Sequence, residues 1–136
     1  MSRTNLILIG LAFLAGAASR TWLTPSLQAQ NRDTKNTELL RADLGAWCSG
    51  KEVRIEIQES GPGTSGKHYH PGHAFAWIVS GSLVRTIQGN TPHTSNVGDV
   101  IHEEPMQVSE TRNSVPVKAL IFRIVEQDKP VTVPVQ

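Results

Sequence analysis

Short runs in which apolar side chains alternate with polar ones dominate the chain after residue 30, and they limit the possible folds more than any other feature. In residues 53–57, valine and isoleucine alternate with arginine and glutamate, which is typical of a β-strand with one buried face. Further apolar or alternating runs cover residues 74–79, 83–87 and 117–125. No helical period of useful length appears beyond residue 30. Short strands separated by turn signals predict an all-β sandwich or barrel.

The turns and the ends of this region refine that prediction. Gly81 lies between two of the runs, and we interpret it as the turn of a hairpin. The run 117–125 is apolar on both faces, as expected for a strand inside a sandwich or barrel. Residues 31–37 are polar, so we expect them to be loosely held. Residues 129–136 contain two prolines and are expected to form an extended tail or an edge strand.

Size and charge narrow the class of protein. The 136 residues leave room for one domain. The 13 Lys and Arg residues nearly balance the 12 Asp and Glu residues, and no run of like charges forms a basic stripe. This balance argues against a nucleic-acid partner.

The amino terminus differs in character from the rest of the chain. Arg3 precedes an uninterrupted apolar run at residues 6–18, and Arg20 follows it. The run is shorter than the roughly 20 residues that a membrane-spanning helix needs. This pattern favours a secretory signal peptide over a membrane anchor, although an uncleaved anchor is the alternative.

The cleavage point defines the domain boundary. Small residues precede two positions, one near residues 17–19 and one at Ala29, and we favour cleavage after Ala29. Residues 1–29 are then the signal peptide, and residues 30–136 form one exported domain, periplasmic or extracellular. We expect no stable membrane span after processing.

All five histidines lie between positions 68 and 102. His68 and His70 are two residues apart, so on a strand both imidazoles point to the same face. If that face is the barrel interior, the pair could hold one divalent ion. A glycine-rich loop at residues 61–66 precedes the pair and a Pro71-Gly72 turn follows it.

Around this pair the sequence resembles a known family. Residues 66–81, GKHYHPGHAFAWIVSG, resemble the first cupin motif, in which a histidine pair is followed at fixed spacing by a glutamate and then a glycine. Gly81 falls on that glycine. Residues 98–113 are similar to the second cupin motif, whose first glycine and last asparagine correspond to Gly98 and Asn113. The resemblance implies an all-β, cupin-like double-stranded β-helix, or jelly-roll barrel, over essentially the whole mature chain.

The metal ligands of the resemblance are incomplete. Ala74 stands at the position of the glutamate ligand, and Ser109 stands at the position of the second-motif histidine. Two imidazoles alone would bind a first-row metal weakly. His73 is adjacent to the missing glutamate, so we predict a site built on His68, His70 and His73. Such a site would hold Fe, Mn, Ni or Zn weakly or not at all.

Other polar residues of this region have alternative interpretations. His102 and Glu104 share one strand face and could reach the interior if that face is inward. Glu103, Glu104 and Glu110 are expected on a solvated rim, because carboxylates are rarely buried unpaired. His93 lies in a turn-rich connection and is expected at the surface.

Three functions from different classes follow, because the cupin fold hosts many activities. The first is a metal-dependent oxidoreductase, lyase or isomerase that acts on a small oxygenated molecule. The second is a metal-free module that binds a small ligand. The third is a structural or dimerisation protein without catalysis. The apolar outer faces of the strands indicate a homodimer in each case.

Removal of the leader is directly testable. The mature protein recovered from the native cell envelope should begin at Gln30, because cleavage after Ala29 removes the apolar run. Intact-mass spectrometry measures this. An intact Met1 terminus in the cytosol would contradict the prediction.

Overall fold

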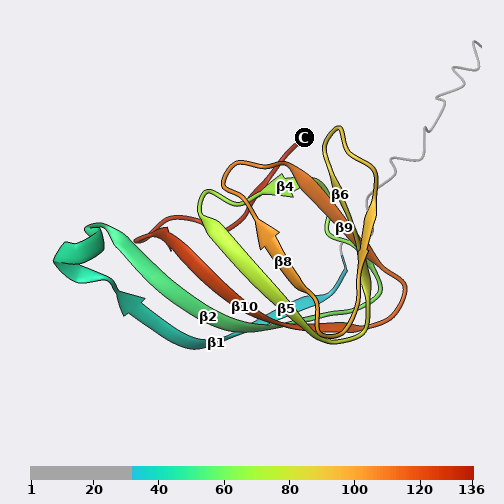
Figure 1. Ribbon diagram of the computed structural model, residues 1–136, viewed down its shortest axis with the longest axis horizontal. Helices are drawn as coiled ribbons and strands as arrows, with labels where there is room; N and C mark the ends of the chain where they lie inside the picture. The colour runs from blue at the N-terminus through green and yellow to red at the C-terminus, as the bar shows by residue number, and fades with distance from the viewer. Residues whose placement is uncertain (1–31) are drawn as a thin grey trace, which may run out of the picture.

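The computed structural model describes residues 32–136, so the predicted signal peptide at residues 1–29 lies outside the described part (Figure 1). The described residues form strands and one short 3-10 helix, and the predicted all-β fold is confirmed. In chain order the elements are β1 (Thr34–Asp43), η1 (Gly45–Cys48), β2 (Lys51–Ser60), β3 (Gly63–Thr64), β4 (His68–Tyr69), β5 (His73–Ser80), β6 (Leu83–Ile87), β7 (His93–Ser95), β8 (Val100–Glu103), β9 (Ser109–Asn113), β10 (Val117–Glu126) and β11 (Val133–Pro134).

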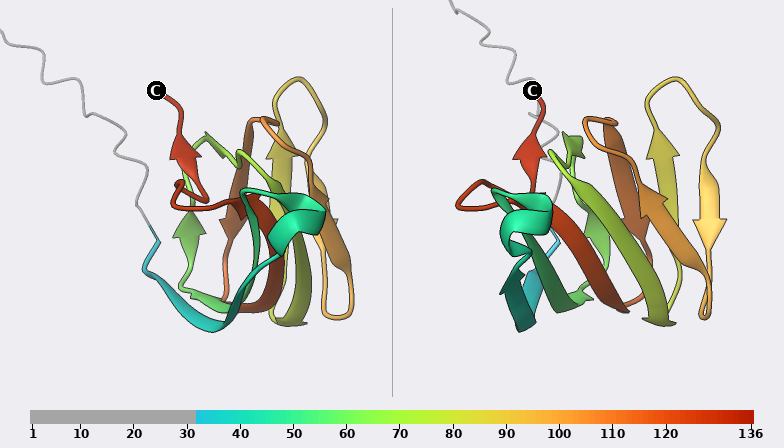
Figure 2. Two further views of the ribbon diagram at one scale, coloured as in Figure 1. Left: turned by 90° about the vertical axis from the view of Figure 1, so that its left-hand side faces the viewer. Right: turned by 60° about the vertical axis from the view of Figure 1, so that its left-hand side comes forward.

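The strands form two antiparallel sheets that face each other (Figure 2). The first sheet has five strands in the order β1-β2-β10-β5-β8. The second sheet has the order β11-β4-β9-β6-β7, and β3 pairs with β9 beside this path. Strands that are neighbours in sequence therefore often lie in different sheets, as in a jelly roll.

Gly81 is where the interpretation from sequence was wrong. β5 pairs with β10 and β8, whereas β6 pairs with β7 and β9 in the other sheet. Gly81 therefore carries the chain from one sheet to the other and does not close a hairpin. Its φ is +78°, and a Cβ atom there would lie 2.3 Å from the carbonyl oxygen of Pro116. A local turn signal cannot distinguish a hairpin from a crossing, because both need a glycine with positive φ.

Small side chains make up much of the core between the sheets. Ile78 is fully buried and is the largest side chain with that degree of burial in the described part of the chain. The core cluster consists of Ala74, Ala76, Ile78, Leu83, Ile101, Val117, Ala119 and Ile121. Three alanines leave space that larger side chains would fill, so the interior of the barrel stays partly open.

Strand β2 faces the opposite way from the prediction, with polar side chains toward the interior and apolar side chains on the outer face. Its glutamates, Glu52 and Glu56, face the interior and are only 5% and 7% exposed. The apolar residues at 53, 55 and 57 lie on the opposite, outer face and are half-buried. Glu56 is tolerated inside because Arg123 of the neighbouring strand β10 donates to it over 3.1 Å. A buried ion pair of this kind offsets the cost of desolvating each charge.

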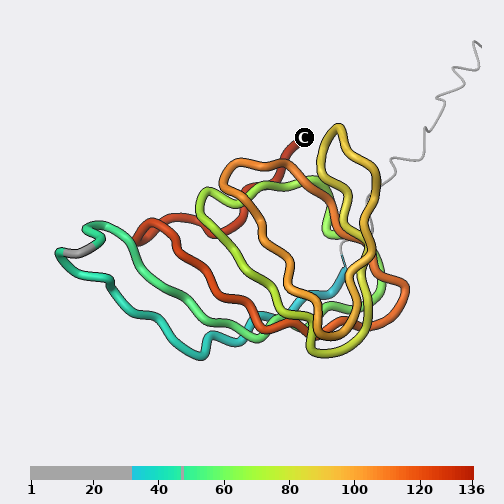
Figure 3. Tube along the Cα trace, in the orientation of Figure 1, coloured from blue at the N-terminus to red at the C-terminus, as the bar shows by residue number. Residues whose placement is uncertain are grey.

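The two chain ends form edge strands. β1 pairs along its whole length with β2, although its side chains are almost all exposed, so the expectation that residues 31–37 are loose is wrong from Thr34 onward. A bulge between Glu38 and Leu40 interrupts this pairing. β11 pairs with β4, which confirms the expected edge strand within 129–136. Figure 3 shows the β1–β2 connection at the end of the molecule away from β6 and β7. Within residues 32–136, no helix is long and apolar enough to cross a membrane.

The crossing at Gly81 gives a stability prediction. Gly81→Ala should lower the free energy of unfolding by more than about 2 kcal/mol, because the new Cβ is both strained at positive φ and too close to a carbonyl oxygen. Gly89→Ala is the matched control, since Gly89 has a similar φ of +86° but open space around it. That control should lose only the conformational part, about 1 kcal/mol. Urea unfolding measures both, and equal losses would contradict the crossing as described.

Candidate metal centre

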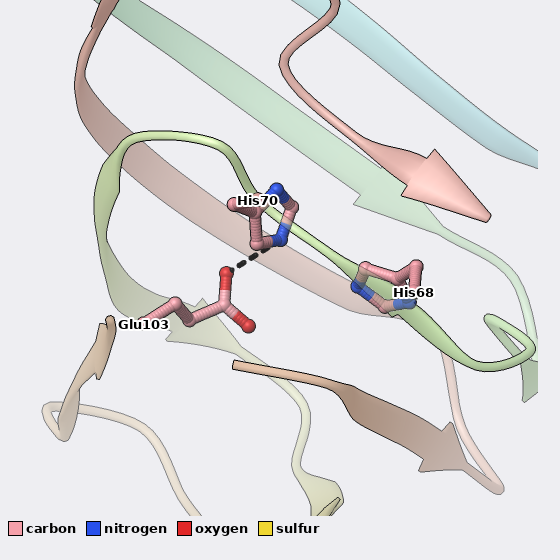
Figure 4. Close-up of side chains that lie close together, drawn as sticks. All are labelled: His68, His70 and Glu103. Atoms are coloured by element: carbon pink, nitrogen blue, oxygen red, sulfur yellow. Dashed lines mark ion pairs between the residues drawn. The ribbon is translucent and has the colours of Figure 1, made fainter. Parts of the chain in front are cut away.

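His68, His70 and Glu103 come together at the end of the cavity between the two sheets (Figure 4). One nitrogen of each imidazole and one oxygen of the carboxylate all lie within 4.8 Å of one another. His68 opens β4 and His70 follows that strand, whereas Glu103 ends β8 in the opposite sheet. We call these three residues the HHE group. Its members point into one space from both sides of the barrel.

One ring nitrogen of each of the two histidines lies next to a backbone carbonyl oxygen. His70 Nδ1 lies 2.7 Å from the carbonyl oxygen of Val131, and His68 Nδ1 lies 2.9 Å from that of Gly66. A carbonyl oxygen only accepts, so both contacts favour a hydrogen on Nδ1, although at His70 the guanidinium of Arg123, which only donates, lies 3.2 Å from the same Nδ1 and competes with this tautomer. Each Nε2 is left for a second partner. Histidine ligands of metals usually have this arrangement, in which the other ring nitrogen donates to a carbonyl or a carboxylate.

Glu103 supplies the carboxylate that is absent at Ala74. The two residues are direct cross-strand partners in the β5–β8 ladder, so their side chains point to the same inner face. The sequence interpretation of Glu103 as part of a solvated rim was wrong, because its side chain is only 12% exposed. The available signal was its spacing from Ile101, which is buried on the same face of β8.

Glu103 is held ionised by the groups around it. Burial alone would raise the pKa of its carboxyl, but the hydrogen bond from His70 and the charges of His70, Arg85 and Arg123 outweigh burial and lower the pKa to about 2. Glu103 Oε2 lies 3.0 Å from His70 Nε2, and Oε1 lies 3.5 Å from Arg85 Nε. Burial is also the main cause that lowers the pKa of His68. A negative carboxylate and a neutral imidazole are the protonation states that a metal ion requires.

A fourth ligand would come from the position beside His68, and the residue there, Ser109, is polar but is not a strong metal ligand. Ser109 is the cross-strand partner of His68, so the two side chains share a face. The Ser109 hydroxyl is buried and has no hydrogen-bond partner among the described residues. Hence the residues present fit a divalent metal held by three protein ligands with one open position, which is the usual composition of a catalytic rather than a structural site.

The structure places His73 outside the HHE group. His73 opens β5 on the outer face of the five-stranded sheet, where its Nδ1 lies 3.0 Å from Nε2 of His102. Both rings stack near Phe75 on that exposed face. Glu104 is exposed next to His102, so this face of β8 is the outward one. His93 is exposed on β7, as expected.

A cavity of about 680 Å³ extends from the HHE group between the sheets. Its walls combine apolar core residues such as Ile78 and Ile121 with charged and hydroxyl-bearing side chains from both sheets. The volume lies in the range of small-molecule sites in other proteins. The cavity can therefore hold a small molecule in contact with the HHE group.

Comparisons with known proteins agree with this architecture. The DMSP lyase DddQ from Ruegeria pomeroyi superposes with a TM-score of 0.61 at 17% identity, covering 74% of this chain and 51% of that one. A cupin-2 domain protein from Rhodospirillum rubrum gives 0.60 at 17% identity, with 77% and 67% covered. An uncharacterised protein from Klebsiella pneumoniae with a double-stranded β-helix domain gives 0.57 at 16% identity, with 76% and 85% covered. The chain spans about half the length of the lyase, and at these identities the likeness is one of fold.

The family assignment rests on the sequence match. No curated protein matches the sequence significantly. The family model described as "Cupin domain" matches residues 54–123, which is more than half of the chain and includes the whole HHE group. With the two facing sheets and the inward histidine pair, this match shows that the chain belongs to the cupin family.

Proposed function

We propose that the protein binds a divalent first-row metal ion through His68, His70 and Glu103 and uses it to bind or act on a small oxygenated molecule in the cavity. The observation that carries the proposal is that both histidines hold Nδ1 within 2.9 Å of a backbone carbonyl oxygen, while a ring nitrogen of each lies within 4.8 Å of the buried carboxylate of Glu103. When bound, such an ion polarises an oxygen atom of a ligand as a Lewis acid. Candidates are Fe, Mn, Ni and Zn, because imidazole and carboxylate suit all four.

The chain's own residues prepare the site for this role. The backbone carbonyls fix the orientation of both imidazoles before a ligand arrives. Arg85 spans from β6 to the loop after β8, donating 3.2 Å to the carbonyl of His102 and 2.9 Å to Gln107. Its guanidinium thereby holds the end of β8, and Glu103 with it, against the opposite sheet.

A metal-free ligand-binding role is the second candidate. It is favoured by the contacts of Glu103, whose carboxylate already has His70 Nε2 at 3.0 Å and Arg85 Nε at 3.5 Å as partners. A metal ion must replace the contact between His70 Nε2 and Glu103, and metal titration therefore separates the two candidates.

We further propose that the domain acts outside the cytoplasm as a homodimer. The apolar run at residues 6–18 supports export. The outer face of the five-stranded sheet supports the dimer, because its large apolar side chains face solvent in a single copy. Half-buried or exposed members of this face are Leu40, Ile55, Ile57, Phe75, Trp77, Val100, Leu120 and Phe122.

A second copy is the occupant that the strand pattern favours. β2 places Glu52 and Glu56 inside and its two isoleucines outside, which is costly for a face that stays in water. Face-to-face packing of two such sheets across a two-fold axis would cover both apolar faces at once. Trp77 lies between Leu120 and Val100 in this face and is half exposed, so it is the natural centre of the contact.

Metal titration tests the site. Zinc binding measured by calorimetry on the mature protein should be weakened at least about tenfold by His70→Ala and by Glu103→Gln, because each removes one of three ligands. Ser109→His should strengthen binding, since it adds an imidazole beside His68 on the same inner face. His73→Ala should leave the affinity unchanged.

The matched control is Glu104→Gln, because Glu104 directly follows β8 and its side chain is exposed beside His102 on the outer face. It makes the same chemical change as Glu103→Gln without touching the cavity. If Glu104→Gln weakens zinc as much as Glu103→Gln does, the HHE group is not the site. Equal affinity in all variants would leave the metal-free role as the conclusion.

The dimer is tested by sedimentation velocity. The wild type should sediment as a dimer, and Trp77→Lys as a monomer, because a charge at the centre of an apolar interface must be desolvated. Val115→Lys is the control, since Val115 is similarly exposed but lies in the loop before β10, away from this face. A monomeric wild type, or a dimeric Trp77→Lys protein, would rule out this interface.

A further inference from the structure

The cavity beside the HHE group has more cationic groups than its own carboxylates engage. Arg32, Lys67 and Arg123 line it as cations, and Glu103 and Glu110 line it as carboxylates. A charged group that is partly buried in such a cavity is stabilised by a partner of opposite charge. A cation without a partner therefore indicates that the cavity accepts an anionic ligand.

Most of these charges are already engaged within the protein. Arg123 donates through Nε to Glu56 over 3.1 Å. Glu110 accepts from the hydroxyl of Thr64 over 2.5 Å. Glu103 belongs to the HHE group. Neither glutamate of the cavity forms an ion pair with Arg32 or Lys67 among the described residues.

Arg32 is held in place by a neutral partner. Its Nη1 donates to Asn113 Oδ1 over 2.8 Å. The amide of Asn113 is fixed in turn, because its Nδ2 donates to the carbonyls of Gly61 and Val115, each over 2.7 Å. Asn113 therefore positions the guanidinium, but an amide cannot neutralise it. Arg32 is therefore oriented but forms no direct ion pair among the described residues.

Two buried polar groups of the cavity wall have no hydrogen-bond partner among the described residues. Within residues 32–136, Arg32 Nε and Thr111 Oγ1 are both buried and lack a hydrogen-bond partner. Both residues line the cavity. A buried donor without a partner costs about 1–3 kcal/mol, so an acceptor that enters the cavity would be stabilised by both groups. Arg32 and Glu103 line the same cavity; burial lowers the pKa of Arg32, and the negative charge of Glu103 partly opposes this.

We propose that the cavity binds a small carboxylate, with its carboxylate group on Arg32 and Thr111 and a second oxygen directed toward the HHE group. A guanidinium with free N–H groups matches the planar, two-oxygen geometry of a carboxylate. Lys67 lies exposed at the cavity wall and adds positive charge along the entry. The second contact rests on the metal site proposed above, whereas the contact with Arg32 does not.

Calorimetry with defined probes tests the inference. Malonate, succinate and glutarate, each compared with its neutral diamide, should be titrated into wild type, Arg32→Gln and Lys35→Gln, with and without zinc. Lys35 is the matched control because it follows Thr34 on β1 and lines a separate surface depression. At least one diacid should bind the wild type and Lys35→Gln alike, and Arg32→Gln at least about tenfold more weakly. The diamides should not bind detectably.

The outcomes separate this inference from the metal proposal. Zinc affinity in Arg32→Gln should equal or exceed that of the wild type, which also shows that the variant is folded. If zinc binds but no diacid depends on Arg32, the carboxylate inference is overturned and the metal site stands. If zinc does not bind but a diacid still requires Arg32, the metal site is overturned and the carboxylate inference stands. Arg32→Lys should restore part of the affinity, because it keeps the charge and loses the two-point geometry.

Discussion

The buried carboxylate of Glu103 is the point on which the arrangement of the site depends. It projects from the five-stranded sheet toward two residues on the opposite side, the imidazole of His70 at 3.0 Å and the guanidinium of Arg85 at 3.5 Å. Leaving a carboxylate unpaired at this depth would cost several kcal/mol. The same contacts that make its burial tolerable also aim it at the histidine pair. One charge therefore fixes the separation of the sheets at this end and completes the ligand set.

The interior around Glu103 contains several buried charged side chains and few large apolar ones. β2 contributes Glu52 and Glu56 to the inside, and β10 contributes Arg123 between apolar neighbours. The remaining core side chains include three alanines, which bury little apolar surface and leave a cavity. The domain thus gives up part of the stability of a filled barrel. It gains a cavity with charged walls in which a polar ligand can be bound.

The sequence predicted the fold well because its signals are local and periodic. The alternating runs and the turn glycines indicated the strands, and the His68-x-His70 spacing indicated two imidazoles on one face. The sequence could not show that Gly81 joins two sheets, because a hairpin and a crossing share the same local requirement. It also could not show which face of β2 is inside. The apolar residues of β2 were assigned to the core, whereas pairing between Glu56 and Arg123, far apart in sequence, decides the orientation.

Ala74 stands where the first cupin motif has a glutamate ligand, but the absence of that residue does not remove the candidate metal site. In an antiparallel ladder, residues directly opposite each other have Cβ atoms about 4.5–5.5 Å apart on one face. A carboxylate at position 103 can therefore reach the space that a longer side chain at position 74 would occupy, and Ala74 leaves that space free. A motif read along one strand records only one of the two equivalent positions. The same argument applies to Ser109, the cross-strand partner of His68. Its side chain points to the same face as His68, but a serine hydroxyl is a poor metal ligand beside imidazole or carboxylate. What the fold preserves is a set of inward directions, and the chemistry of the site is decided by which cross-strand position carries the ligand.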